Sequence, residues 1–169
     1  VVTQDITLEL DENGEASITA DQIDNGSTDN CGIETLALDV TEFDCSNVGA
    51  NTVTLTVTDV NGNESSETAT VTVQDNSMPI VVTQDITLEL DQNGEVSVTA
   101  AEIDNGSSDN CGIESLVLDV TEFDCSNVGT NTVTLTVTDV NGNESSSTAI
   151  VTVEDNMAPA VITQDILID

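Results

Sequence analysis

The chain contains the same 80-residue segment twice. Residues 81–160 differ from residues 1–80 at 15 positions, which leaves 65 of 80 identical, and a third copy begins at Val161. A period of 80 residues exceeds the roughly 20–45 residues of a solenoid repeat and suits one small β-sandwich per repeat. We therefore expect the chain to be part of a longer array. The predicted domains are an immunoglobulin-like repeat at 1–78, a second at 79–158, and the first strand of a truncated third at 159–169.

Each repeat alternates apolar and polar residues with the period of a β-strand. The alternation is clear in residues 6–10 and strongest in residues 53–59, where Val and Leu alternate with Thr. Turn signals containing Gly, Asn and Asp separate six or seven such strands, and no window has helical periodicity. This pattern predicts an all-β chain of tandem immunoglobulin-like β-sandwiches arranged as an extended rod, with Phe43 and Phe123 in the cores.

The chain has 33 acidic residues and no Lys, Arg or His, so its formal net charge is −33. Binding to nucleic acid or to an anionic membrane surface requires cationic side chains, which this chain lacks. Membrane insertion requires a long apolar run, and the sequence has none. Catalysis is equally poorly supplied, because His, Lys, Arg and Tyr are absent. We expect no enzyme, no nucleic-acid partner and no membrane insertion.

The cysteines occur in two pairs, each separated by 14 positions: Cys31 with Cys45, and Cys111 with Cys125. An even number at fixed spacing predicts one local disulfide in each repeat, worth about 3 kcal/mol for a loop of this length. A disulfide indicates an extracellular location. The alternative is buried, reduced cysteines. Zinc is disfavoured by the absence of His and of a CxxC pair.

Two clusters of Asp and Asn recur in each repeat, one in IDNGSTDNCG and one in TDVNGNES. In an immunoglobulin-like sandwich these would be the B–C and F–G loops at one end, where the linker from the preceding repeat also arrives. Convergent oxygen ligands without any cation are what Ca²⁺ requires, although Asp and Asn are also ordinary turn residues. The predicted Ca²⁺ ligands at the junction are Asp75, Asn76, Asp104, Asp109, Asp139, Asn141 and Asn143. The equivalent residues of the first repeat are Asp24, Asp29, Asp59, Asn61 and Asn63.

The strings DNCGI and FDCSNVGANTVTLTVTDVNGN, with a DN…P linker, carry a family resemblance. They resemble the HYR-type, immunoglobulin-like tandem repeats of very large surface proteins in Bacteroidota, among them the SprB-type gliding adhesins. The resemblance covers both complete repeats. It implies a β-sandwich, exposure at the bacterial cell surface, a role as stalk or adhesin, and export by the type IX secretion system.

Together these patterns predict stalk or spacer repeats of a large secreted adhesin, stiffened by Ca²⁺ at the junctions and by disulfides. The expected partners are the neighbouring repeats of the same chain. Binding hot spots are usually aromatic or Arg, and the chain has only two Phe and no Arg. Two alternatives stay open: a repeat-borne face that binds polysaccharide or another flat substrate, and self-assembly of copies into a filament.

Overall fold

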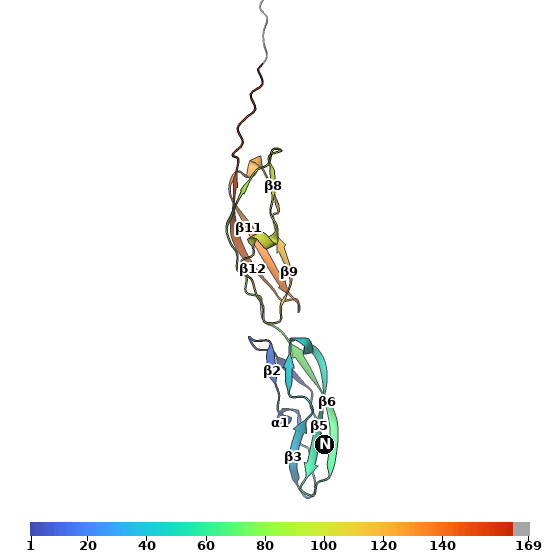
Figure 1. The fold of residues 1–169 in the computed structure, drawn as a ribbon. Coiled ribbons are helices and arrows are strands. Elements are labelled where there is room, and N and C mark those ends of the chain that lie inside the picture. Colours follow the sequence, from blue (N-terminus) through green and yellow to red (C-terminus); the bar gives the residue numbers. More distant parts are fainter. Residues whose placement is uncertain (164–169) are drawn as a thin grey trace, which may run out of the picture. The chain divides into compact units, whose positions relative to one another are not determined.

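The computed structural model describes residues 1–163; the end of the predicted third-repeat strand, residues 164–169, lies outside the described residues. The first repeat contains six strands (Figure 1). They are β1 Ile6–Glu9, β2 Glu15–Ser17, β3 Ile33–Leu38, β4 Glu42–Asp44, β5 Gly49–Asp59 and β6 Glu64–Gln74. The second repeat has the matching set, β7 Ile86–Glu89, β8 Glu95–Ser97, β9 Ile113–Leu118, β10 Glu122–Asp124, β11 Gly129–Asp139 and β12 Glu144–Glu154.

Each repeat is a sandwich of a four-stranded and a two-stranded sheet. In the first repeat the orders are β1-β6-β5-β3 and β2-β4, and in the second β7-β12-β11-β9 and β10-β8. The long strands β5 and β6 form an antiparallel hairpin, while β1 pairs parallel with β6. These sheets confirm the predicted all-β tandem sandwiches.

The apolar residues of the alternating strands form the cores. In β5 the buried Val53, Leu55 and Val57 face the same side as Val71 of β6, and Phe43 of β4 packs in the same core. The second repeat buries the equivalent residues, Phe123 among them. The period-2 pattern therefore identified the buried face of both sheets.

One local difference from the sequence prediction is a four-residue α-helix in each repeat, α1 Ala20–Ile23 and α2 Ala100–Ile103. Each repeat also has a 3-10 turn, at Cys45–Asn47 and at Cys125–Asn127. Thr19 and Gln22 form a capping box around α1, with Gln22 Oε1 accepting from the Thr19 N–H over 2.8 Å. A four-residue helix is too short to show a 3.6-residue period, so only its cap could have revealed it.

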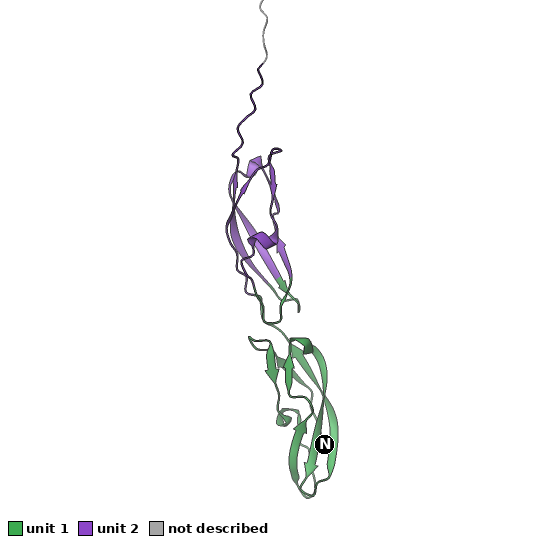
Figure 2. Cartoon of the chain, viewed as in Figure 1, with its two compact units in different colours: residues 1–79, 108–114, 138–144 green, residues 80–107, 115–137, 145–169 purple. Residues whose placement is uncertain are grey.

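The compact units of the structure do not coincide with the sequence repeats (Figure 2). Unit 1 contains residues 1–79 and two further loops, 108–114 and 138–144. Unit 2 contains 80–107, 115–137 and the described residues from 145 onward. Two loops of the second repeat therefore belong with the first, and these loops carry the site described below.

Within the described residues, the helices are all too short to cross a membrane.

Candidate metal centre and disulfide

Asp75 directly follows β6 and is buried, with 6% of its surface exposed. The Ser77 N–H donates to Asp75 Oδ1 over 3.1 Å and fixes the local turn. Two asparagines donate to the same carboxylate, Asn141 Nδ2 to Oδ2 over 2.6 Å and Asn110 Nδ2 to Oδ1 over 3.4 Å. All four residues belong to unit 1. The linker carboxylate is thus held by side chains from both loops of the second repeat.

Asp139 is the last residue of β11 and is fully buried. Its Oδ1 accepts the N–H groups of Asn141 and Asn143, both at 2.8 Å, and its Oδ2 accepts Asn143 Nδ2 at 2.7 Å. A positive φ of 91° at Gly142 allows this tight turn. Burial is the largest single influence on the pKa of Asp139 and raises it, but the donors from Asn143 and Asn141 together outweigh burial and lower the pKa. Asp139 is therefore held as a buried carboxylate anion.

Asp109 lies in the loop before β9. Its Oδ1 accepts the N–H groups of Cys111 at 2.9 Å and Gly112 at 3.2 Å. Its other oxygen, Oδ2, is buried and has no hydrogen-bond partner among the described residues, and the same is true of Asn110 Oδ1. A buried oxygen without a partner is costly and rare in folded proteins. Asp109 therefore keeps one buried carboxylate oxygen that is available as a ligand.

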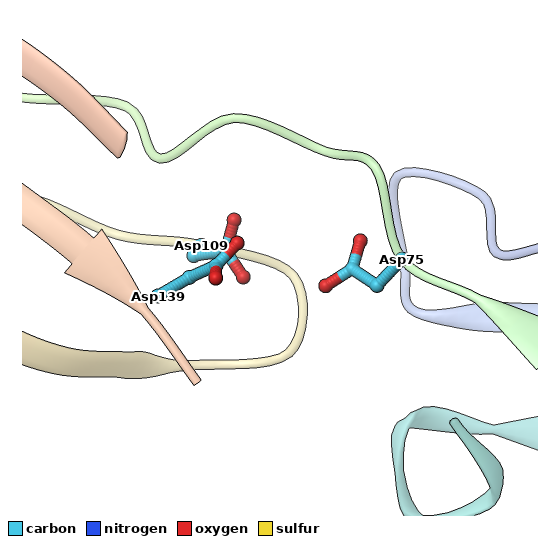
Figure 3. A group of neighbouring side chains, drawn as sticks. All are labelled: Asp75, Asp109 and Asp139. Atoms are coloured by element: carbon cyan, nitrogen blue, oxygen red, sulfur yellow. The ribbon is translucent and has the colours of Figure 1, made fainter. Parts of the chain in front are cut away.

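Asp75, Asp109 and Asp139 form one carboxylate cluster, with an oxygen from each lying within 4.8 Å of the others. Figure 3 shows Asp75 pointing toward the other two carboxylates from the opposite side. No Lys, Arg or His exists in the chain to neutralise them. Three like charges at this separation repel one another strongly in a partly desolvated site.

The donor set of this carboxylate cluster fits a hard divalent cation. Ca²⁺ takes six to eight oxygen ligands, from carboxylates, amide carbonyls, backbone carbonyls and water. The cluster offers three carboxylates, and the unpartnered Asp109 Oδ2 is of the type that Ca²⁺ prefers. A cation here would both satisfy this oxygen and offset the repulsion.

The structure brings together five of the seven residues predicted for this junction. Besides the carboxylate cluster these are Asn141 and Asn143, and Asn143 Nδ2 also lies 3.2 Å from the backbone carbonyl of Asp75. Asp104 lies elsewhere, in unit 2, where it caps α2 and accepts the N–H groups of Gly106 and Ser107. Asn76 also points away, with Nδ2 donating to Glu9 Oε1 over 3.3 Å. The loop from 104 to 112 is long enough to separate Asp104 from Asp109.

In the first repeat the equivalent residues adopt the same local turns. Asp59 accepts the N–H groups of Asn61 and Asn63, both at 2.8 Å, and Asn63 Nδ2 at 2.7 Å. Asp29 accepts the Cys31 N–H at 2.8 Å. Asp24 accepts the N–H groups that follow it, as Asp104 does. Among the described residues these carboxylates belong to no three-membered cluster.

A disulfide lies beside the carboxylate cluster and joins Cys45 of the first repeat to Cys111 of the second. The two Cα atoms are 5.4 Å apart and both residues belong to unit 1. Cys31 and Cys125 are exposed and unpaired within the described part of the chain. The predicted local bridges, Cys31–Cys45 and Cys111–Cys125, are therefore wrong.

Strand geometry explains the correction. Ile33 of β3 pairs with Asp59 at one end of β5, and Cys31 lies just before it. Cys45 begins the 3-10 turn Cys45–Asn47, which leads into Gly49 at the other end of the same strand. Eleven residues of strand span about 30 Å, and a disulfide requires Cα atoms within about 7 Å. The two cysteines of one repeat are therefore at opposite ends of its sheet and cannot meet.

We call the place where Asp75 and Cys45 meet the loops 108–114 and 138–144 the joint. Sequence reasoning missed three residues around this joint. Asn110 Nδ2 donates to the backbone carbonyl of Asp11 over 3.0 Å. Gly14 lies against the disulfide, since a Cβ on it would be 2.5 Å from Cys45 Sγ. Asn110 could have been found, because it directly precedes Cys111. Asp11 and Gly14 lie in a sequence typical of any hairpin turn, so nothing in it marked them as part of the joint.

The chain matches no protein-family model and no curated protein. Among solved structures, the protocadherin γB4 extracellular domain has a TM-score of 0.42 at 11% identity, over 90% of this chain and 31% of that one. Protocadherin γB7 cadherin domains 1–4 score 0.40 at 12% identity, over 91% and 51%. The fibronectin(III)-like modules of Clostridium thermocellum CbhA score 0.34 at 11% identity, over 96% of both chains. The chain spans about half or less of the protocadherins, and all three likenesses are too distant to bear on function.

Proposed function

We propose that these repeats are stalk units of a large secreted surface adhesin, in which Ca²⁺ and a disulfide hold each repeat to the next. The observation that carries the proposal is the carboxylate cluster of Asp75, Asp109 and Asp139, with its unpartnered Asp109 oxygen. One ligand comes from the linker and two from loops of the second repeat. A cation bound by all three fixes the linker to those loops.

The disulfide supports the same role by different chemistry. Cys45 and Cys111 join consecutive repeats covalently, at the place where the linker carboxylate contacts the loops. Disulfides persist in oxidising compartments, which favours an extracellular location. Export by the type IX secretion system rests on the sequence resemblance alone.

A stalk also fits what the surface offers. Binding sites in interfaces are enriched in Trp, Tyr and Arg, and this chain has none of them. Its repeats instead conserve the joint: the three Asp positions and both Cys positions are identical in the two copies. A fixed, repeated joint is what a spacer of defined length requires.

The test is thermal unfolding of the protein in excess EGTA, in millimolar Ca²⁺ and in millimolar Mg²⁺. Mass action stabilises a folded protein by about 4 kcal/mol when ligand exceeds Kd a thousandfold. We expect a large upward shift with Ca²⁺ and a small one with Mg²⁺, because Mg²⁺ demands a smaller octahedral site and keeps its waters. Equal small shifts with both ions would reduce the effect to charge screening and overturn the calcium joint.

Two matched variants locate the effect. Asp109→Asn removes one charge from the carboxylate cluster, and Asp29→Asn makes the same change in the equivalent turn of the first repeat. We expect Asp109→Asn to lose the Ca²⁺ shift and to melt above the wild type in EGTA, because the repulsion is reduced. Asp29→Asn should keep the wild-type shift. A Ca²⁺ response that both variants lose equally, or both keep, would place the cation elsewhere.

A further inference from the structure

One loop carries both a carboxylate of the cluster and one half of the disulfide. In loop 108–114, Asp109 Oδ1 accepts the Cys111 N–H over 2.9 Å and the Gly112 N–H over 3.2 Å. The other oxygen of the same carboxylate, Oδ2, is buried and has no partner among the described residues. The Asp109 carboxylate and the Cys111 half of the disulfide are therefore held together as one piece.

The residue between them fastens the loop to the first repeat. Asn110 Nδ2 donates to the Asp11 carbonyl over 3.0 Å and to Asp75 Oδ1 over 3.4 Å. Cys45 Sγ lies 3.6 Å from the Asn110 backbone carbonyl. The disulfide and the carboxylate cluster thus lie at the two ends of a three-residue segment, and a displacement of one displaces the other.

Without a cation, the carboxylate cluster opposes this contact. An oxygen from each of Asp75, Asp109 and Asp139 lies within 4.8 Å of the others, and no Lys, Arg or His exists in the chain to offset the charge. The repulsion acts between the linker and the two loops. The bond from Cys45 to Cys111 crosses the same contact and resists the repulsion. Reduction of the bond leaves the repulsion in place and removes what resists it.

We propose that the Cys45–Cys111 disulfide controls the calcium site: the carboxylate cluster binds Ca²⁺ tightly when the bond is formed and weakly when the bond is reduced. This inference rests on the proposed function, since it takes the carboxylate cluster as the Ca²⁺ site. It adds the redox state of the joint as the regulator of that site.

The direction follows from what Ca²⁺ must order in each state. In the oxidised protein a bond between residues 66 apart already holds Asp109 beside Asp75. In the reduced protein the cation alone must order the loop and the linker, so its apparent affinity falls with the fraction of molecules in which the joint is closed. Coupling between two sites typically changes affinity by about 5–150-fold, and it is reciprocal. Ca²⁺ therefore favours the formed disulfide by the same factor.

Reduction of the joint by a small dithiol balances without a further reactant. A thiolate of the dithiol attacks one sulfur of the Cys45–Cys111 bond, forms a mixed disulfide and releases the other cysteine thiolate. The second thiolate of the dithiol then attacks the dithiol sulfur of the mixed disulfide and releases the second cysteine. The protein gains two electrons and two protons as two thiols, and the dithiol loses them as it becomes a cyclic disulfide. Both cysteines are half-buried, so neither sulfur is sealed in a core.

The first measurement compares Ca²⁺ affinity in the two redox states. Cys31 and Cys125 are both replaced by Ser, so that the joint holds the two remaining cysteines of the chain. Binding calorimetry with Ca²⁺ follows this two-serine protein before and after reduction with dithiothreitol, at constant ionic strength. A four-serine protein, with Cys45→Ser and Cys111→Ser added, is the matched control. We expect about tenfold weaker binding after reduction, equal to that of the control, whose affinity should not respond to dithiothreitol.

The second measurement tests the reverse effect and needs no variant that lacks the bond. The two-serine protein is equilibrated with mixtures of reduced and oxidised dithiothreitol in EGTA, in Ca²⁺ or in Mg²⁺. Thiol alkylation and mass spectrometry then give the fraction of formed disulfide. We expect Ca²⁺ to favour the disulfide by about tenfold, which is about 30 mV for this two-electron couple, and Mg²⁺ to have a much smaller effect. Adding Asp109→Asn should abolish the Ca²⁺ effect.

The outcomes separate this inference from the proposed function. Ca²⁺-specific binding of equal affinity in the oxidised and reduced protein, with no effect of Ca²⁺ on the disulfide, would keep the calcium joint and overturn its redox control. No Ca²⁺ binding by the oxidised protein would overturn both. An effect on the disulfide that Mg²⁺ reproduces, or that Asp109→Asn retains, would reduce the coupling to charge screening and overturn the redox control as well.

Discussion

The two copies of the DNCG loop have the same sequence but different surroundings. In the second repeat Asn110 is half-buried and donates to Asp11 and Asp75, and Cys111 is bonded to Cys45. In the first repeat the equivalent asparagine and cysteine are exposed. The loop's own backbone turn is unchanged. The turn is therefore encoded locally, while its burial depends on what covers it.

The turn after the long strand shows the same contrast. Asp139 is fully buried and Asp59 is 9% exposed, although both accept the same three hydrogen bonds from the asparagines that follow. Asn141 makes a further bond to Asp75, an extra contact that arises from the linker. An array of such repeats needs no special sequence at its joints, because each repeat supplies both halves.

The largest difference between the two copies should follow removal of their cysteines. Cys111→Ser breaks a disulfide between residues 66 apart, which the chain-entropy model values at about 4 kcal/mol. Cys31→Ser changes an exposed thiol and should alter the free energy of unfolding by less than about 0.5 kcal/mol. Denaturant unfolding of freshly purified monomer under non-reducing conditions measures both.

Counting free thiols in denaturant provides the control. Wild-type monomer should have two, Cys31→Ser one and Cys111→Ser three. Under reducing conditions the stabilities of wild type and Cys111→Ser should converge. A wild type with no free thiol, or equal losses in the two variants, would restore the local bridges within each repeat.

A smaller difference in stability between the two repeats should appear at Gly14 and Gly94, the glycines that lie against Cys45 Sγ and Cys125 Sγ. Gly14 and Gly94 have φ of 74° and 77°, so Ala strains both by about 1–2 kcal/mol. At Gly14 the new Cβ would also lie 3.1 Å from the carbonyl of Asn110, and its neighbour Cys45 is fixed by the disulfide. Cys125 is free to rotate away. Gly14→Ala should therefore be more destabilising than Gly94→Ala by about 1 kcal/mol, as measured by denaturant unfolding.

A second glycine pair isolates the backbone contribution. Gly62 and Gly142 also have positive φ, but a Cβ on either would meet no atom within 4 Å. Ala at these two positions should destabilise equally. If Gly14→Ala and Gly94→Ala also prove equal, the tight packing at the joint would not distinguish the two repeats.

The fold was largely predictable because its signals are local and periodic. Alternation in β5 identified Val53, Leu55 and Val57 as core, and Phe43 is buried as expected. The single turn of α1 was missed, since four residues carry no period. The rod-like arrangement stays a prediction.

The site was predictable only where the sequence fixes which end of the sheet a residue occupies. Asp109 was found because it lies shortly before β9, and Asp139 because it ends β11. Asp75 was found because it directly follows β6. The disulfide was mispredicted because spacing along the chain was taken as proximity in space. The length of β5 already separates Cys31 from Cys45, so a bridge to the next repeat was the geometric alternative.

The smallest predicted effect concerns acid, at positions where the two repeats should behave alike. Asp39 Oδ1 accepts the Thr54 N–H, and Asp119 Oδ1 the Thr134 N–H, both at 2.7 Å. These backbone hydrogen bonds are the main cause that lowers the pKa of each carboxyl below its usual 3.8, against a smaller opposing effect of burial.

Because the folded pKa is lower, the unfolded chain takes up the proton first as the pH falls. The stabilisation from each carboxylate is therefore complete above the ordinary value of about 3.8 and is lost as the pH falls through the lower folded pKa. Asp39→Asn and Asp119→Asn should each flatten the dependence of melting temperature on pH below about 4, by the same small amount because both side chains are exposed and screened. Melts between about pH 5 and 2.5, on protein freed of Ca²⁺ beforehand, measure this. Unequal flattening would mean that the influence of the joint extends beyond the two loops, into the sheets that otherwise appear identical.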